Sequence, residues 1–199
     1  MTLPKQIRFG TYVAKIVYEK QSRDHDYFAT DIILQKFTVY TEYPLETVKY
    51  ELFQAIIYQL VGYLMRMIGD KKFCFDQFSR VLYSLLRSNP DLISKIIPDK
   101  VIILGKVFQV CYQTQLKDLI CGELDYSFAT ISLQDNMGKR QMFTVFWHEV
   151  IHEIVCIIDR SFDKEDFVHQ LAILVSELIY GNDLSWIFEE TKDGIPKVD

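Results

Sequence analysis

The stretch TVFWHEVIHEI, Thr144–Ile154, places His148 and His152 four positions apart, with Glu149 directly after the first histidine. On an α-helix, residues at this spacing lie on one face about 6 Å apart, so both imidazoles can point at one metal ion. Apolar residues surround the three polar ones, and buried imidazoles and carboxylates are costly without partners. The stretch therefore predicts a core helix that binds zinc through two histidines.

Such a site needs a general base and a third ligand. Glu149 is placed to take a proton from a water molecule beside the metal. Since a catalytic zinc ion normally has three protein ligands, a further ligand is expected from the segment DKEDFVHQLAILVSEL, residues 163–178. Glu165 in its first turn and Glu177 near its end lie about 18 Å apart along a helix, so only one reaches the ion. The spacing does not select between them.

Outward from this helix, the chain shows the same order of segments twice. Aromatic and β-branched residues predict strands, and apolar residues at helical spacing predict helices. In the second half the strands are at 101–113 and 128–135 and the helices at about 141–159 and 164–180. In the first half the strands are at 7–19 and 33–43, and the helices at 45–67 and from 74 to a stop at Asn89-Pro90.

A shift of 94 positions aligns the two halves and matches Asp31 to Asp125, without a gap up to Val61 and Val155. We therefore expect an α+β fold of two strand-strand-helix-helix lobes that form a pseudo-duplicated pair. The lobes would divide near Pro98, into residues 1–98 and 99–199.

The same shift predicts different chemistry for the two lobes. His148 and Glu149 fall on Gln54 and Ala55, and His152 falls on Tyr58. The first lobe is therefore expected to be a degenerate copy that keeps the helix and lacks the metal ligands.

The composition limits the class of protein. With 49% hydrophobic residues the chain is expected to fold, and 22 Lys and Arg against 27 Asp and Glu give no basic field for nucleic acid. The N-terminal segment MTLPKQIRFG lacks the apolar core of a secretory signal, and no stretch approaches the roughly 18 uncharged residues of a membrane span. The cysteines form no C-x-x-C pair and are expected to be free, buried thiols of a cytoplasmic protein: Cys74, Cys111, Cys121 and Cys156.

The segments CGELDYSFATISLQDNMGKRQMFTVFWHEVIHEI, residues 121–154, and EDFVHQLAILVSEL, residues 165–178, resemble a known family. They are similar to small zinc-peptidase-like proteins of phages and mobile elements related to the ImmA/IrrE group. In those relatives a G-E-[IL]-D-Y…T-I-x-L strand pair leads into the H-E-x-x-H helix, and a later helix brings an acid to the metal. The resemblance runs from about Val101 to Asp183 and implies a zincin-like fold.

The resemblance also implies a ligand set and a function. In the family, the ligating glutamate lies three residues before an A-N-x-F-A stretch. When that stretch is aligned with V-H-Q-L-A, which begins at Val168, the glutamate falls on Glu165. Glu177 is kept as the second candidate for the third ligand. His169 departs from the family pattern; it could stabilise the transition-state oxyanion or simply pack, and packing is the expected role. The implied function is a zinc-dependent peptidase acting on a protein, such as a repressor of a phage or mobile element. Its location would be the bacterial host cytoplasm.

The alternative hypothesis is a non-catalytic zinc-containing binding protein or pseudoenzyme, for example a phage counter-defence inhibitor. The first lobe would then dock a protein partner through Tyr40, Tyr43, Tyr50 and Tyr58. In a third interpretation the first lobe is an internal dimer partner that covers apolar surface of the second. The ligand set also suits manganese or iron.

Overall fold

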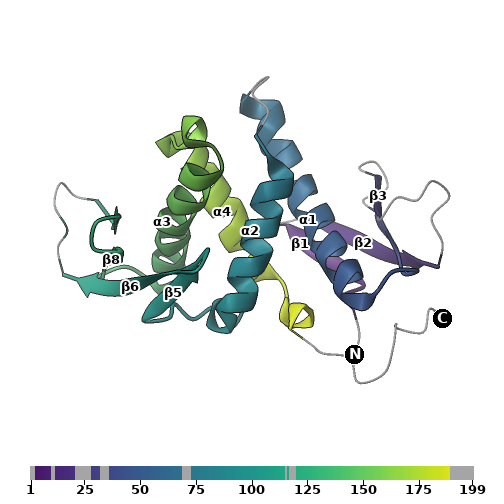
Figure 1. The fold of residues 1–199 in the computed structure, drawn as a ribbon, viewed down its shortest axis with the longest axis horizontal. Coiled ribbons are helices and arrows are strands. Elements are labelled where there is room, and N and C mark those ends of the chain that lie inside the picture. Colours follow the sequence, from purple (N-terminus) through teal and green to yellow (C-terminus); the bar gives the residue numbers. More distant parts are fainter. Residues whose placement is uncertain are drawn as a thin grey trace.

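The computed structural model describes residues 3–9, 12–20, 28–31, 36–68, 73–114, 116 and 120–188. Within these ranges each half has four strands followed by two long helices (Figure 1). The first half contains β1 (Gln6–Phe9), β2 (Tyr12–Glu19), β3 (Phe28–Asp31), β4 (Lys36–Tyr40), α1 (Leu45–Ile68) and α2 (Phe75–Ser88). The second contains β5 (Lys100–Ile103), β6 (Lys106–Gln113), β7 (Gly122–Asp125), β8 (Thr130–Gln134), α3 (Lys139–Asp159) and α4 (Glu165–Gly181). The α+β class is confirmed.

The prediction of two strands in each half is wrong, because each half has four. The expected strand at 101–113 is a hairpin that turns at Leu104 and Gly105, whose φ angles of 49° and 82° lie in the left-handed region. The expected strand at 7–19 likewise divides into β1 and β2. Its positions 10 and 11, and positions 33–35 of the next expected strand, lie outside the described residues.

The two sheets share one topology. Their strand orders are β1-β2-β4-β3 and β5-β6-β8-β7, with antiparallel, parallel and antiparallel pairs in that sequence. Gln6 pairs with Lys15, and Lys100 pairs with Gln109, so both partners move by the same offset (100 − 6 = 94, 109 − 15 = 94). The shift noted in the sequence therefore reproduces the pairing register of both sheets.

The helices lie side by side between the two sheets, which are at opposite sides of the molecule in Figure 1. One continuous apolar core runs through both halves and includes Phe53 and Leu82 from the first and Trp147 and Leu171 from the second. The helices therefore bury their apolar faces against the other half as well as against their own sheet.

Two asparagines join the halves reciprocally. Asn89, after α2, donates to the carbonyl of Ile102 in β5 and accepts from its N–H, both at 2.8 Å. Asn182, after α4, donates to the carbonyl of Arg8 in β1 at 2.8 Å and accepts from its N–H at 2.7 Å. Each half thus uses the end of its second helix to hold the first strand of the other. This is the isologous pattern that a two-fold axis produces.

One helical segment, Lys139–Phe162, is long and apolar enough to cross a membrane by length and composition, and half of it is buried inside the protein. Since Glu149 and Glu153 lie within it, the expectation that no stretch approaches 18 uncharged residues is not contradicted. The segment packs against α2, α4 and the second sheet, and Trp147 at its centre is fully buried. These contacts are those of a core helix.

Candidate metal centre

Helices α3 and α4 bring two imidazoles and a carboxylate to one point. Nε2 of His148 lies 3.0 Å from Nε2 of His152. The Glu165 carboxylate places one oxygen 3.2 Å from the first nitrogen and the other 3.3 Å from the second. Ligands about 2.05 Å from a tetrahedral zinc ion are separated by about 3.3 Å. The spacing of the three donors therefore fits a zinc ion, and within the described part of the chain they are the one such group of three.

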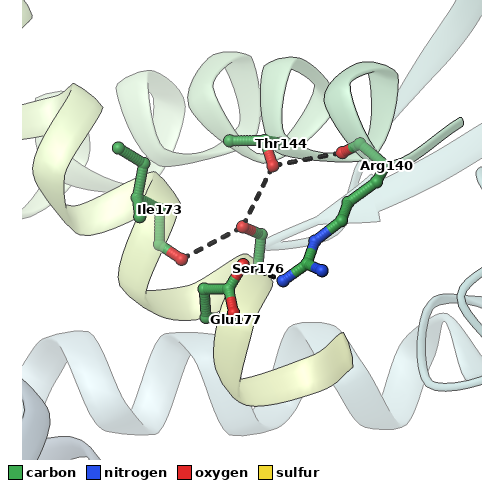
Figure 2. Close-up of polar contacts among 5 residues, drawn as sticks. All are labelled: Arg140, Thr144, Ile173, Ser176 and Glu177. Carbon is green, nitrogen blue, oxygen red and sulfur yellow. Dashed lines mark hydrogen bonds and ion pairs between the residues drawn. The ribbon is translucent and has the colours of Figure 1, made fainter. Parts of the chain in front are cut away.

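The antiparallel packing of α3 and α4 determines which acid reaches the histidines. A short 3-10 turn, Arg160–Phe162, connects the helices, so the start of α4 faces the middle of α3. At the other end, Figure 2 shows Glu177 paired with Arg140 at the start of α3. The structure thus brings Glu165, and not Glu177, to the imidazoles.

A second carboxylate orients one of the histidines. Asp163 Oδ1 lies 2.6 Å from Nδ1 of His152, a contact that places the proton on Nδ1 and leaves Nε2 with a lone pair for a metal. Burial and the neighbouring His152 lower the pKa of His148, which favours the neutral ring that a metal ligand requires. The sequence offered Asp163 only as one of several acids near the turn, without a role.

Replacing Asp163 with asparagine is expected to weaken zinc binding by about 10- to 100-fold, because the His152 ring loses its charged partner. Competition with a chromophoric chelator measures this affinity. Asp166→Asn is the matched control, since it removes an exposed acid three residues further on, in the first turn of α4. An affinity within twofold of the wild type in Asp163→Asn would remove the orienting role.

The side chain of Glu149 is buried and hydrogen-bonded next to the proposed ligands. Its side chain is 6% exposed, and the backbone N–H of Leu124 in β7 donates to its carboxyl group. A Cβ atom on Gly122 would lie 2.6 Å from Oε1 of Glu149 and 2.6 Å from a methyl group of Val145. The strand can therefore approach the carboxylate only with glycine at this position.

Burial, together with the negative charges of Glu165 and Glu123, raises the pKa of Glu149 to about 8. A carboxyl group with a pKa near the working pH is suited to accept a proton from water and release it again within one catalytic cycle. Position and pKa are therefore consistent with the general base expected from the sequence.

The raised pKa predicts a pH effect on the metal-free protein. Because the pKa of Glu149 is about 8 in the folded chain and 4.5 ordinarily, the folded state binds more protons between these values. The free energy of unfolding should therefore fall as the pH rises through this window. Glu149→Gln removes this contribution and should gain on the order of 3 kcal/mol relative to wild type between pH 5 and pH 8. Urea unfolding with a chelator present measures the free energy of unfolding of both proteins at each pH. A difference between wild type and Glu149→Gln that does not change with pH would contradict the prediction.

The ligand group opens into a cavity of about 680 Å³ between α3, α4 and the edge strand β7. Ile120 and Tyr126 line the cavity beside the acids. His169 also lines it, exposed and with its ring centroid 5.8 Å from that of His148. The imidazole of His169 is thus exposed at the cavity wall and contacts the ring of His148. A cavity of this size admits an extended peptide segment or a small molecule.

The equivalent place in the first half carries no such group. Gln54 donates to Asp76 at 2.9 Å, Ala55 is buried, and Tyr58 is 53% exposed. Of the four tyrosines of the hypothetical docking surface, Tyr40, Tyr43 and Tyr50 are partly buried and Tyr58 is well exposed.

The four cysteines are free, as expected, but none is fully buried.

Comparisons of the chain with protein-family models, with curated proteins and with solved structures found no match.

Proposed function

We propose that the chain is a zinc-dependent peptidase that hydrolyses a peptide bond in a protein partner. The observation that carries the proposal is the spacing of the three donor groups, from 3.0 to 3.3 Å, on His148, His152 and Glu165. In the proposed site these residues hold the ion, and Glu149 lies one residue from a ligand at the cavity wall. A bound zinc ion would polarise the scissile carbonyl and lower the pKa of a water molecule.

The chain's own residues supply the remaining steps. Glu149 accepts a proton from the attacking water and delivers it to the departing amine, so the carboxylate ends the cycle in its starting form. Asp163 keeps Nε2 of His152 directed at the ion. The edge strand β7 fixes the Glu149 carboxyl through the N–H of Leu124. Low exposure of Glu149 excludes bulk water from the proton transfer.

We also propose a zincin-like architecture derived from duplication, with lobes at 1–98 and 99–199 and a relationship to the ImmA/IrrE group. The common strand order, the common 94-residue offset of the pairing register and the reciprocal asparagine contacts support duplication. The HExxH-type helix beside a GELD edge strand supports the relationship. In this proposal the substrate is a repressor of a phage or mobile element in the host cytoplasm.

The test is incubation of the purified, zinc-loaded chain with a bacterial proteome, followed by mass spectrometry of newly formed protein N-termini. We expect new termini that are absent with a chelator and absent with the His148→Ala variant. A stoichiometric complex without new termini would instead favour the alternative of a non-catalytic binding protein. Termini that are unchanged in His148→Ala would show that another activity produces them.

A further inference from the structure

The turn that carries Asp163 and Glu165 is anchored by two buried phenylalanines, one on each side. Phe162 precedes the turn and Phe167 lies in the first turn of α4, and they are only 6% and 5% exposed. Their ring centroids are 5.4 Å apart. Both rings close on Phe73, which comes from the first half of the chain just before α2, at centroid distances of 5.1 and 5.2 Å. The first and second halves of the chain are therefore in contact at the turn that carries Glu165, the proposed third ligand.

The turn is also held by the Asp163–His152 contact and by backbone hydrogen bonds to Arg160 and Phe162, whereas the Glu165 side chain itself has fewer constraints. The N-cap residue of α4, Lys164, makes no side-chain capping hydrogen bond. The Glu165 side chain is 80% exposed, and among the described residues its ion-pair contacts are those to His148 and His152. Because neither a side-chain cap nor burial holds the carboxylate itself, its place depends on the position of this turn, to which the packing of the flanking rings contributes.

Phe73 is itself held at a fixed place relative to the second half. It is 4% exposed and also packs on Phe78 of α2 at a centroid distance of 5.8 Å. Helix α2 packs along α3, and its far end is tied to β5 by Asn89. Packed side chains thus connect α2 of the first half, through Phe73, to the turn that carries Asp163 and Glu165.

We propose that Phe73 is a positioning residue for the metal site, through which the first half, whose described residues supply no ligand, holds Glu165 at coordinating distance and Asp163 at hydrogen-bond distance from His152. This inference rests on the proposed function, since it assumes that the group binds zinc. It gives the first half a role in the site despite its lack of ligands. Loss of the ring should let the turn shift and weaken the third ligand while both histidines stay in place on α3.

The experiment compares metal binding by the full chain and its Phe73→Leu variant, with Zn²⁺ affinity measured by chelator competition and ligand geometry by the visible absorption of bound Co²⁺. We expect Phe73→Leu to bind Zn²⁺ about 10-fold more weakly, within the range found for residues that orient metal ligands. Its Co²⁺ spectrum should shift toward that of Glu165→Gln.

The matched control is Phe53→Leu, the same change at a fully buried site in the first half whose ring packs on Tyr83 at 5.3 Å. This variant should lose stability but keep the wild-type affinity and spectrum. If Phe73→Leu does not fold, Phe162→Leu opens the same ring cluster from the side of the turn and should show the same loss.

The outcomes separate the two claims. Wild-type binding together with unchanged affinity and spectrum in Phe73→Leu would overturn the positioning role and leave the proposed function standing. Equal losses in Phe53→Leu and Phe73→Leu would also overturn it, because the effect would then be one of general stability. A wild-type chain that binds neither ion would overturn the proposed function itself, and the positioning role with it.

Discussion

The Glu149→Gln variant is expected to bind zinc as the wild type does and to lose about 10²- to 10⁴-fold in the rate of peptide hydrolysis. Glutamine has nearly the same shape as glutamate and keeps the hydrogen bond from the Leu124 N–H, but it cannot accept a proton from water. The proposed ligands His148 and His152 are untouched by the change. Zinc content by elemental analysis and cleavage rate on a substrate found in the proteome screen measure the two effects.

Glu153→Gln is the matched control for this prediction. Glu153 is another buried glutamate, one turn further along α3 and 5% exposed, and burial raises its pKa as well. It is not among the residues that line the cavity. Its variant should therefore cleave at close to the wild-type rate. Full proteolysis by Glu149→Gln, or equal losses in both variants, would contradict the assignment of the general base.

The second large effect is expected at the third ligand. Replacing Glu165 with glutamine removes the anionic donor and leaves two neutral imidazoles, so zinc affinity should fall by more than about 100-fold. Glu177→Gln, a matched change on the same helix, breaks only the ion pair with Arg140 and should leave zinc affinity unchanged. Chelator competition on both purified variants decides between the two acids, and a loss confined to Glu177→Gln would place the metal elsewhere.

The long helices could be predicted closely, whereas the strands could not. Helix α1 was expected at 45–67 and spans Leu45–Ile68, since its apolar residues recur at helical spacing over many turns. The hairpin β5–β6 was predicted as one strand, because its apolar pattern continues through the turn at Leu104 and Gly105. The short strand β7 has too few residues for a periodic signal, so it was implied only by the G-E-[IL]-D-Y stretch of the family resemblance.

The candidate site could likewise be predicted only in part from the sequence. The spacing of His148 and His152 on one helix predicts their convergence, because helix geometry alone determines it. The choice between Glu165 and Glu177 depends on how α4 packs on α3, which spacing within one helix does not encode. The Asp163 contact is likewise tertiary, and so is the close approach of Gly122 to Glu149. Each joins segments whose relative placement follows only from the packed core.

The account rests on one divalent ion held between α3 and α4, and anomalous diffraction at the zinc edge from crystals of the zinc-loaded chain tests it most directly. We expect one anomalous peak per chain, about 2.0–2.2 Å from Nε2 of His148, Nε2 of His152 and a carboxylate oxygen of Glu165. A map with no peak there, with the two imidazoles turned away from each other, would contradict it.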